Sequence, residues 1–337
     1  MNPFYNREQK RLRALWRILI QGGLFVLGTT LVGVVVAVLV FLVMAVTGQA
    51  DLELLMNQEA LMQAFMSMGG GWFFAFNGIG TVIIVVLTFL LAGWLLDRRK
   101  FSDFGFHFSR IWWLDMGFGL LLGAVLMLVI FLIELAFGWI TIEGWMHVRT
   151  SGSFISAFFA SLVGFIAVGI YEEMFSRGYH LRNLAEGLNW GVLGKRGGLW
   201  AGYLISSSIF GILHATNPNA SLISTVNLIL AGLFLGLGFV LTGELAIPIG
   251  LHITWNFFQG NIFGFPVSGS NTGATLIHIQ QGGPDLLTGG AFGPEAGLIG
   301  IFAILLGSAL TILYVKKTRG EVRLRTELAV FASPFKK

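Results

Sequence analysis

Long apolar runs are the feature of this sequence that most restricts its fold. Several of them reach the ~18–25 residues that a helix needs to cross a lipid bilayer. Only 11% of the residues are charged, against about 25% in typical soluble domains. The chain is therefore predicted to be an all-α, polytopic membrane protein rather than a soluble protein with a large core.

Eight segments are predicted to cross the membrane as helices. Their approximate ranges are 18–46, 72–96, 111–138, 154–175, 199–216, 221–242, 246–260 and 295–315. The sequence shows no internal repeat and no second soluble domain, so residues 1–337 are expected to form a single membrane domain.

The positions of the basic residues predict how the chain is oriented. Lys and Arg gather in the cytoplasmic loops of membrane proteins. With both termini in the cytoplasm, Arg149 is the single one of 21 Lys and Arg residues that falls outside. This asymmetry predicts cytoplasmic termini, and it explains the net charge of +4 without a nucleic-acid partner. The expected location is a bacterial plasma membrane, as an integral multi-pass protein in contact with the lipid bilayer.

Two long connections are predicted to face the outer side. Residues 47–71 form one of them, and its segment 51–68 places Leu and Met side chains at helical spacing. That spacing predicts an amphipathic helix lying on the membrane surface. The other connection, 261–293, is rich in glycine and is expected to be a lid or a flexible loop.

The stretch GIYEEMFSRGYH places charged residues at the end of the fourth apolar run. A charged residue at the middle of a span raises the free energy of membrane insertion by about 2.5–3.5 kcal/mol, so it is expected to have an interaction partner or a functional role. Glu173 and Arg177 are separated by four residues and can pair on one helix face. Glu172 has no such local cation. A desolvated carboxylate beside a like charge can act as a general base.

Further polar groups occur in two other apolar segments. FGILHATNP places His214 near the end of the fifth segment, and IPIGLHITWNFFQG places His252 and Asn256 on one face of the seventh. Short loops allow these helices to pack together. A carboxylate and a histidine can hold and deprotonate water, while a second histidine and an amide can donate hydrogen bonds to an oxyanion. The set predicts peptide or ester hydrolysis.

Rival chemistries for such a site lack their motifs. The sequence contains no HExxH, no GxSG, no GxGD and no cysteine. A zinc ion held by Glu172, His214 and His252 is a lower-ranked alternative, because His and Glu are suitable zinc ligands. The preferred interpretation is water activation without a metal or another cofactor.

Three motifs together carry a family resemblance. EEMFSR fits EExxxR, FGILH fits FxxxH and HITWN fits HxxxN, in this order and on separate segments. The chain thus resembles the CAAX prenyl endopeptidase and bacteriocin-processing (CPBP, or Abi) family of glutamate intramembrane proteases over about residues 170–260. The resemblance implies a catalytic core at about 154–260 and a membrane-associated peptide or protein as substrate.

The resemblance also implies roles for individual residues. Glu172 and His214 would activate the water, while His252 and Asn256 would form the oxyanion hole. The expected function is that of a CAAX-type intramembrane endopeptidase.

Glu173 and Arg177 would support this site without acting on the substrate. Two alternatives remain open at this stage. One is a non-catalytic membrane adaptor or bacteriocin-immunity protein that retains the polar site. The other is a proton-linked transporter. The sequence makes no prediction of the oligomeric state.

Overall fold

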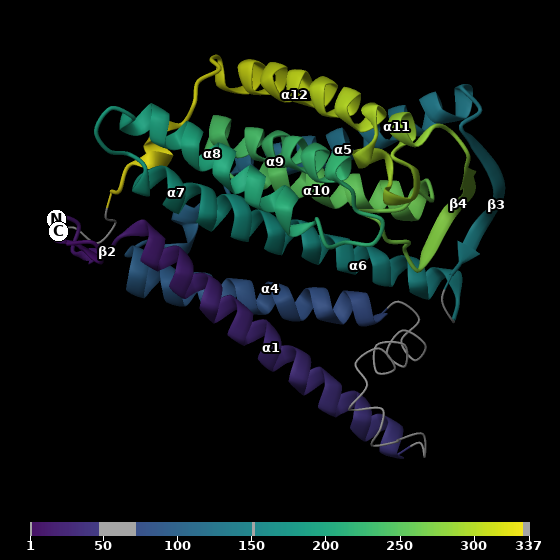
Figure 1. Ribbon diagram of the computed structural model, residues 1–337, viewed down its shortest axis with the longest axis horizontal. Helices are drawn as coiled ribbons and strands as arrows, with labels where there is room; N and C mark the ends of the chain where they lie inside the picture. Colours follow the sequence, from purple (N-terminus) through teal and green to yellow (C-terminus); the bar gives the residue numbers. More distant parts are fainter. Residues whose placement is uncertain (1, 47–71, 150–151, 333–337) are drawn as a thin grey trace.

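The computed structural model describes residues 2–46, 72–149 and 152–332, which fold mainly into a bundle of helices (Figure 1). The predicted amphipathic helix at 51–68 lies outside the described residues. The main helices are α1 (Ala14–Val46), α4 (Trp72–Ala92), α5 (Arg110–Ala136), α6 (Phe154–Glu173), α8 (Gly194–Leu213), α9 (Leu222–Thr242), α10 (Ala246–Phe257) and α12 (Leu298–Arg319). Shorter helices are α7 (Arg182–Gly187) and α11 (Asp285–Thr288).

Six helices in the described part of the chain are long and apolar enough to cross a membrane. They are Ala14–Val46, Trp72–Asp97, Arg110–Ala136, Phe154–Gly187, Leu222–Thr242 and Leu298–Arg319. The protein is thus an integral multi-pass membrane protein. The other two predicted segments are also helical, but α10 has only 12 residues and α8 begins with the polar sequence GKRGG. A count of eight spans therefore stays a prediction.

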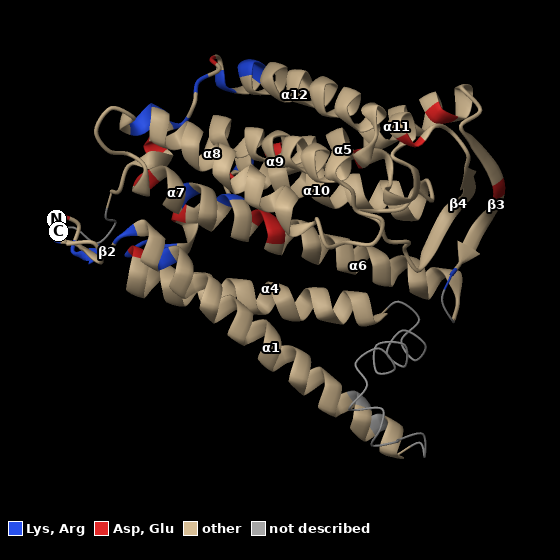
Figure 2. Cartoon of the chain, viewed as in Figure 1, with Lys and Arg blue, Asp and Glu red and all other residues tan. Residues whose placement is uncertain are grey.

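Most basic residues of the molecule gather at one end of the bundle. Figure 2 shows Lys and Arg around the end that holds both chain termini, the start of α8 and the end of α12. Basic residues favour the cytoplasmic side of a membrane. The arrangement fits the predicted cytoplasmic termini, and the orientation itself stays a prediction.

A two-stranded ribbon at the opposite end is the main departure from the all-α prediction. β3 (Ile140–Val148) pairs antiparallel with β4 (Ala274–Gln281), which belongs to the predicted Gly-rich loop. The segment TLIHIQ alternates polar and apolar residues, as a half-buried strand does. Part of the loop is therefore ordered as a strand. A second, minimal pair joins β1 (Tyr5–Asn6) to β2 (Arg11–Leu12).

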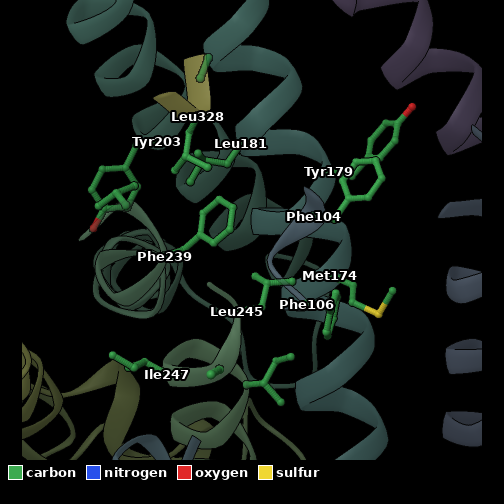
Figure 3. Packing of buried hydrophobic residues seen from close by; sticks show 14 of the residues in the cluster. Phe104, Phe106, Met174, Tyr179, Leu181, Tyr203, Phe239, Leu245, Ile247 and Leu328 are labelled. Carbon is green, nitrogen blue, oxygen red and sulfur yellow. The ribbon is translucent and has the colours of Figure 1, made fainter. Parts of the chain in front are cut away.

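An apolar cluster fills the bundle near the end that holds the termini (Figure 3). Phe104 and Tyr179 are both fully buried, with stacked rings whose centroids are 5.8 Å apart. Phe239 from α9 and Leu328 from the C-terminal segment belong to the same cluster. Side chains from distant parts of the sequence thus close this end of the bundle.

A group of buried ion pairs adjoins this cluster, and we call it the terminal charge cluster. Its members are Arg11, Arg17, Asp97, Arg99 and Glu186. The guanidinium of Arg17 lies 2.5 Å from Asp97 and 3.2 Å from Glu186. Arg11 lies 2.6 Å from Glu186, to which Arg99 is also paired. The cluster ties the N-terminal segment to the end of α4 and to α7.

Candidate active site

All four predicted catalytic residues line one cavity of about 690 Å³. They are Glu172, His214, His252 and Asn256. Three helices contribute them, because Glu172 belongs to α6, His214 caps the end of α8, and the other two belong to α10. The volume is in the range of ligand-binding and active-site pockets. The structure therefore brings together residues that are far apart in the sequence.

The helix that carries the EExxxR motif changes geometry within the motif. α6 ends at Glu173, and a π-helical stretch, η3 (Met174–Leu181), follows without a break. Such stretches are rare and often occur at functional sites. One turn earlier, Gly169 faces Ile253 of α10 so closely that a Cβ atom there would clash. The missing side chain lets α10 approach the carboxylates of α6.

Glu173 is fully buried and binds two partners through the same oxygen. Arg177 Nη1 donates to its Oε1 at 2.9 Å, which confirms the predicted pairing. His252 Nδ1 lies 2.8 Å from that oxygen, a contact that the sequence did not reveal. Because an ionised carboxylate only accepts hydrogen bonds, Nδ1 is the protonated nitrogen in this contact. Glu173 therefore fixes the orientation of the His252 ring.

Glu172 is placed differently from its neighbour. Its side chain is 22% exposed and lines the cavity. Its Oε2 atom is buried and has no hydrogen-bond partner among the described residues, and it lies 3.9 Å from His252 Nε2. That separation is too long for a direct hydrogen bond, but one water molecule can contact both atoms. The carboxylate is thus available to a water in the cavity.

The histidine of the FxxxH motif is also oriented by its own helix. His214 Nδ1 lies 2.8 Å from the carbonyl oxygen of Phe210, which can only accept a hydrogen bond. Nδ1 therefore carries the proton, and Nε2 keeps a free lone pair. The ring of Phe210 has its centroid 4.8 Å from that of His214 and 6.1 Å from that of His252. The motif phenylalanine thus spaces the two histidines.

Asn256 follows His252 by one helical turn and is partly buried in the cavity wall. α10 is short, and a π-helical stretch, η4 (Phe258–Ile262), continues it. The start of the helix is already buried, because Ala246 and Ile247 have almost no exposed surface. A helix that begins inside the bundle can bring its side chains to the level of His214.

Several polar residues of the cavity wall were missed by the sequence analysis. They are Asn217, Ser268, Ser270, Asn271 and Glu295. Most belong to the predicted Gly-rich loop, where glycine content alone indicated flexibility. The signal that was overlooked is Glu295, an acidic residue in the otherwise apolar sequence AFGPEAGLIG. Apolar side chains cover much of the remaining wall, among them Phe25, Phe74, Phe165, Phe175 and Phe234.

The acidic and histidine side chains of the cavity are also the candidates for binding a metal ion. In the part of the chain that the structure describes, no group of three or more His, Cys, Asp or Glu side chains is arranged to hold a metal ion. Metal-free water activation and the zinc alternative both stay predictions.

The match to a known family coincides with this site. Residues 153–258 match the family model for type II CAAX prenyl endopeptidase Rce1-like proteins. The chain carries an Rce1-like domain. The domain runs from the start of α6 to the residue after α10 and so contains all three motifs. Rce1-like proteins are a CAAX protease family, which supports a membrane peptidase and confirms the resemblance inferred from the motifs. No curated protein and no solved structure matches the chain.

Proposed function

We propose that this protein is a glutamate-type intramembrane endopeptidase that hydrolyses a peptide bond of a membrane-associated peptide or protein. The observation that carries the proposal is the convergence of Glu172, His214, His252 and Asn256 on one cavity. A carboxylate with an unpaired oxygen, two oriented imidazoles and an amide are the groups that acyl hydrolysis requires.

The proposed reaction assigns one task to each of these groups. Glu172 Oε2 and His214 Nε2 hold a water molecule, and Glu172 takes its proton as the water oxygen attacks the scissile carbonyl carbon. Asn256 donates a hydrogen bond from its amide to the oxyanion that forms. His252 donates from Nε2 when both of its ring nitrogens carry protons, while its Nδ1–H remains on Glu173. The protonated base then passes its proton to the leaving amine.

The walls of the cavity suggest the kind of substrate. Aromatic side chains cover much of the surface around the polar groups, so the site suits a substrate with apolar side chains or a lipid anchor. The family name refers to prenylated CAAX sequences. A farnesylated CAAX peptide is accordingly the first defined substrate to test.

The test compares the protein termini in membranes that contain wild-type protein or Glu172→Gln. We expect cleavage products with the wild type that are missing with the variant. Glu134→Gln is the matched control, because Glu134 is a fully buried glutamate of α5 that does not line the cavity. Identical products from a folded Glu172→Gln protein would overturn the proposal.

A second experiment decides between the two forms of water activation. Purified protein in nanodiscs is given the farnesylated peptide with and without a metal chelator. Full activity in the chelator supports the metal-free mechanism. Activity that is lost and then restored by zinc would instead support zinc held by Glu172, His214 and His252.

A further inference from the structure

Glu295 lies in the cavity wall but belongs to none of the three motifs. We infer that Glu295 is a positioning residue that holds His214 in place through Ser268 and Asn217. The inference rests on the proposed function, because it assigns Glu295 a task in that reaction. A continuous series of hydrogen bonds runs from Glu295 to the residues that follow His214.

The first link joins Glu295 to a neighbouring turn. Glu295 belongs to η6 (Pro294–Ala296) and is only 3% exposed. Its Oε1 accepts hydrogen bonds from the backbone N–H of Ser268 at 2.6 Å and from the Ser268 hydroxyl at 3.3 Å. Its Oε2 accepts one from Gln259 Nε2. Within the described chain these bonds reach no catalytic residue directly, so any effect on catalysis passes through the turn.

The turn itself has an unusual backbone. Val267 and Ser270 form two backbone hydrogen bonds with each other, at 2.8 and 2.9 Å. Between them, Ser268 has φ 45° and Gly269 has φ 83°, so both residues are left-handed. This conformation is uncommon for a residue other than glycine and has a cost in conformational free energy. The two bonds from Ser268 to Glu295 offset that cost and keep the turn in one conformation.

The second link joins the turn to the segment after His214. Asn217 Nδ2 donates to the carbonyl oxygen of Ser268 at 3.1 Å, and Asn219 Nδ2 donates to that of Gly269 at 3.2 Å. A Cβ atom on Gly269 would collide with the Pro218 carbonyl oxygen. Two side chains and a close backbone approach therefore hold the segment 217–219 against the turn.

The last link reaches His214. The backbone N–H of Asn217 donates to the carbonyl oxygen of His214 at 3.1 Å. His214 is the capping residue at the end of α8, where carbonyl groups lack helical partners and helices tend to fray. The series of hydrogen bonds from Glu295, which we call the Glu295 brace, fixes the end of α8 in a position that the helix end alone would not keep. A displacement of about 1 Å at a catalytic group can lower the rate about 10²-fold.

Hydrogen exchange of backbone amides tests the Glu295 brace without an activity assay. Full-length wild-type protein and Glu295→Ala are compared in nanodiscs by mass spectrometry. We expect the backbone amides of residues 215–217, 219 and 220 to exchange about tenfold faster in the variant, because the hydrogen bonds that hold this segment against the turn are weakened. Glu295→Gln keeps an acceptor for Ser268 and should restore most of the protection. Glu143→Gln, which removes a partly exposed carboxylate of β3, should leave these amides unchanged.

Kinetics with the farnesylated peptide, or with a substrate found by terminus mapping, test the consequence. Glu295→Ala should lower kcat about 10- to 100-fold with little change in KM, and Glu295→Gln should recover most of the loss. In a His214→Ala background, Glu295→Ala should cause no further loss, because both changes act on the same group.

Three outcomes would overturn the inference. They are unchanged exchange at 215–220 in Glu295→Ala, a rise in KM with kcat unchanged, and effects of Glu295→Ala and His214→Ala that multiply. Failure of the proposed function looks different. In that case the wild type cleaves nothing, while the exchange experiment still reports on the Glu295 brace.

Discussion

Buried charges occur in two regions of the bundle, and they are satisfied to different extents. In the terminal charge cluster, arginine side chains directly contact the carboxylates of Asp97 and Glu186. In the cavity, Oε1 of Glu173 is bound in the same way by Arg177 and His252, but Oε2 of Glu173 and Oε2 of Glu172 have no hydrogen-bond partner among the described residues. In the first region each carboxylate is paired with arginine, whereas in the second Glu172 lines the cavity with one oxygen unpaired.

The difference shows how one bundle uses buried charge for two purposes. A buried ion pair that loses one partner leaves an uncompensated charge. A cluster in which every carboxylate is paired with arginine therefore resists rearrangement and holds the segments that carry it together. A carboxylate that keeps one oxygen without a hydrogen-bond partner contributes less to holding segments together, but that oxygen can bind and deprotonate water. Substitutions in the two regions should therefore affect different measurements.

The largest expected effect is on activity in the cavity. Glu172→Gln should lower the cleavage rate by about 10³- to 10⁴-fold, because the amide cannot accept the proton of the water. The melting temperature in detergent should stay within a few degrees of the wild type. A variant that unfolds would show that Glu172 contributes to structure and would remove the contrast with the cluster.

The next largest effect is on stability in the terminal charge cluster. Glu186→Gln leaves Arg11, Arg17 and Arg99 facing one another and should reduce the free energy of unfolding by about 3–5 kcal/mol. Denaturant titration in micelles measures this loss. The protein that remains folded should keep the wild-type KM, since Glu186 does not line the cavity. A loss in the free energy of unfolding below about 1 kcal/mol would contradict the view that the terminal charge cluster holds its segments together.

A pH series separates the cavity wall from the cluster. Burial raises the pKa of Glu295 from 4.5 to about 7, against the opposing hydrogen bonds from Ser268 and Gln259. The pKa of Glu295 is higher in the folded protein than in the unfolded chain. Protonated Glu295 therefore makes its full contribution to the free energy of unfolding below about pH 4.5, and this contribution is lost as the pH rises towards 7. The loss should be on the order of 3 kcal/mol. Melting curves from pH 4.5 to 7.5 should show this slope, and Glu295→Gln should flatten it.

The smallest effect is expected where charge is exposed. Glu143 on β3 is 44% exposed and lies 3.6 Å from His278. Glu143→Gln should change the free energy of unfolding by less than about 1 kcal/mol, because surface pairs are screened by solvent. A loss comparable to that of Glu186→Gln would show that burial does not explain the difference between the regions.

The sequence predicted those features that depend on neighbours along the chain. Apolar runs located the helices, and the spacing of Glu173 and Arg177 predicted their contact. The three motifs identified residues that the structure brings to one cavity. Each of these signals lies within a few residues or follows from composition.

Features that depend on distant residues could not be predicted in this way. Glu173 contacts His252 across 79 positions, and Asp115 contacts Arg319 across 204. The partner strand of β3 lies in a segment whose glycines indicated a loop. Glu295 was overlooked for the same reason, since its partners are fixed by the packing of loops rather than by a period in the sequence.

The β3–β4 ribbon has a consequence for how such a protein can change over evolution. Its strands lie on either side of the Rce1-like domain, and next to them the N–H of Arg149 donates to the Gly273 carbonyl oxygen at 2.9 Å. The segments that precede and follow the domain along the chain are therefore held together at residues 149 and 273. A unit with adjacent ends can be inserted into, or combined with, different neighbours without being pulled apart. α5, which lies outside the domain, nevertheless packs closely against α10 at Gly123, so the domain depends on a neighbouring helix as well as on the ribbon.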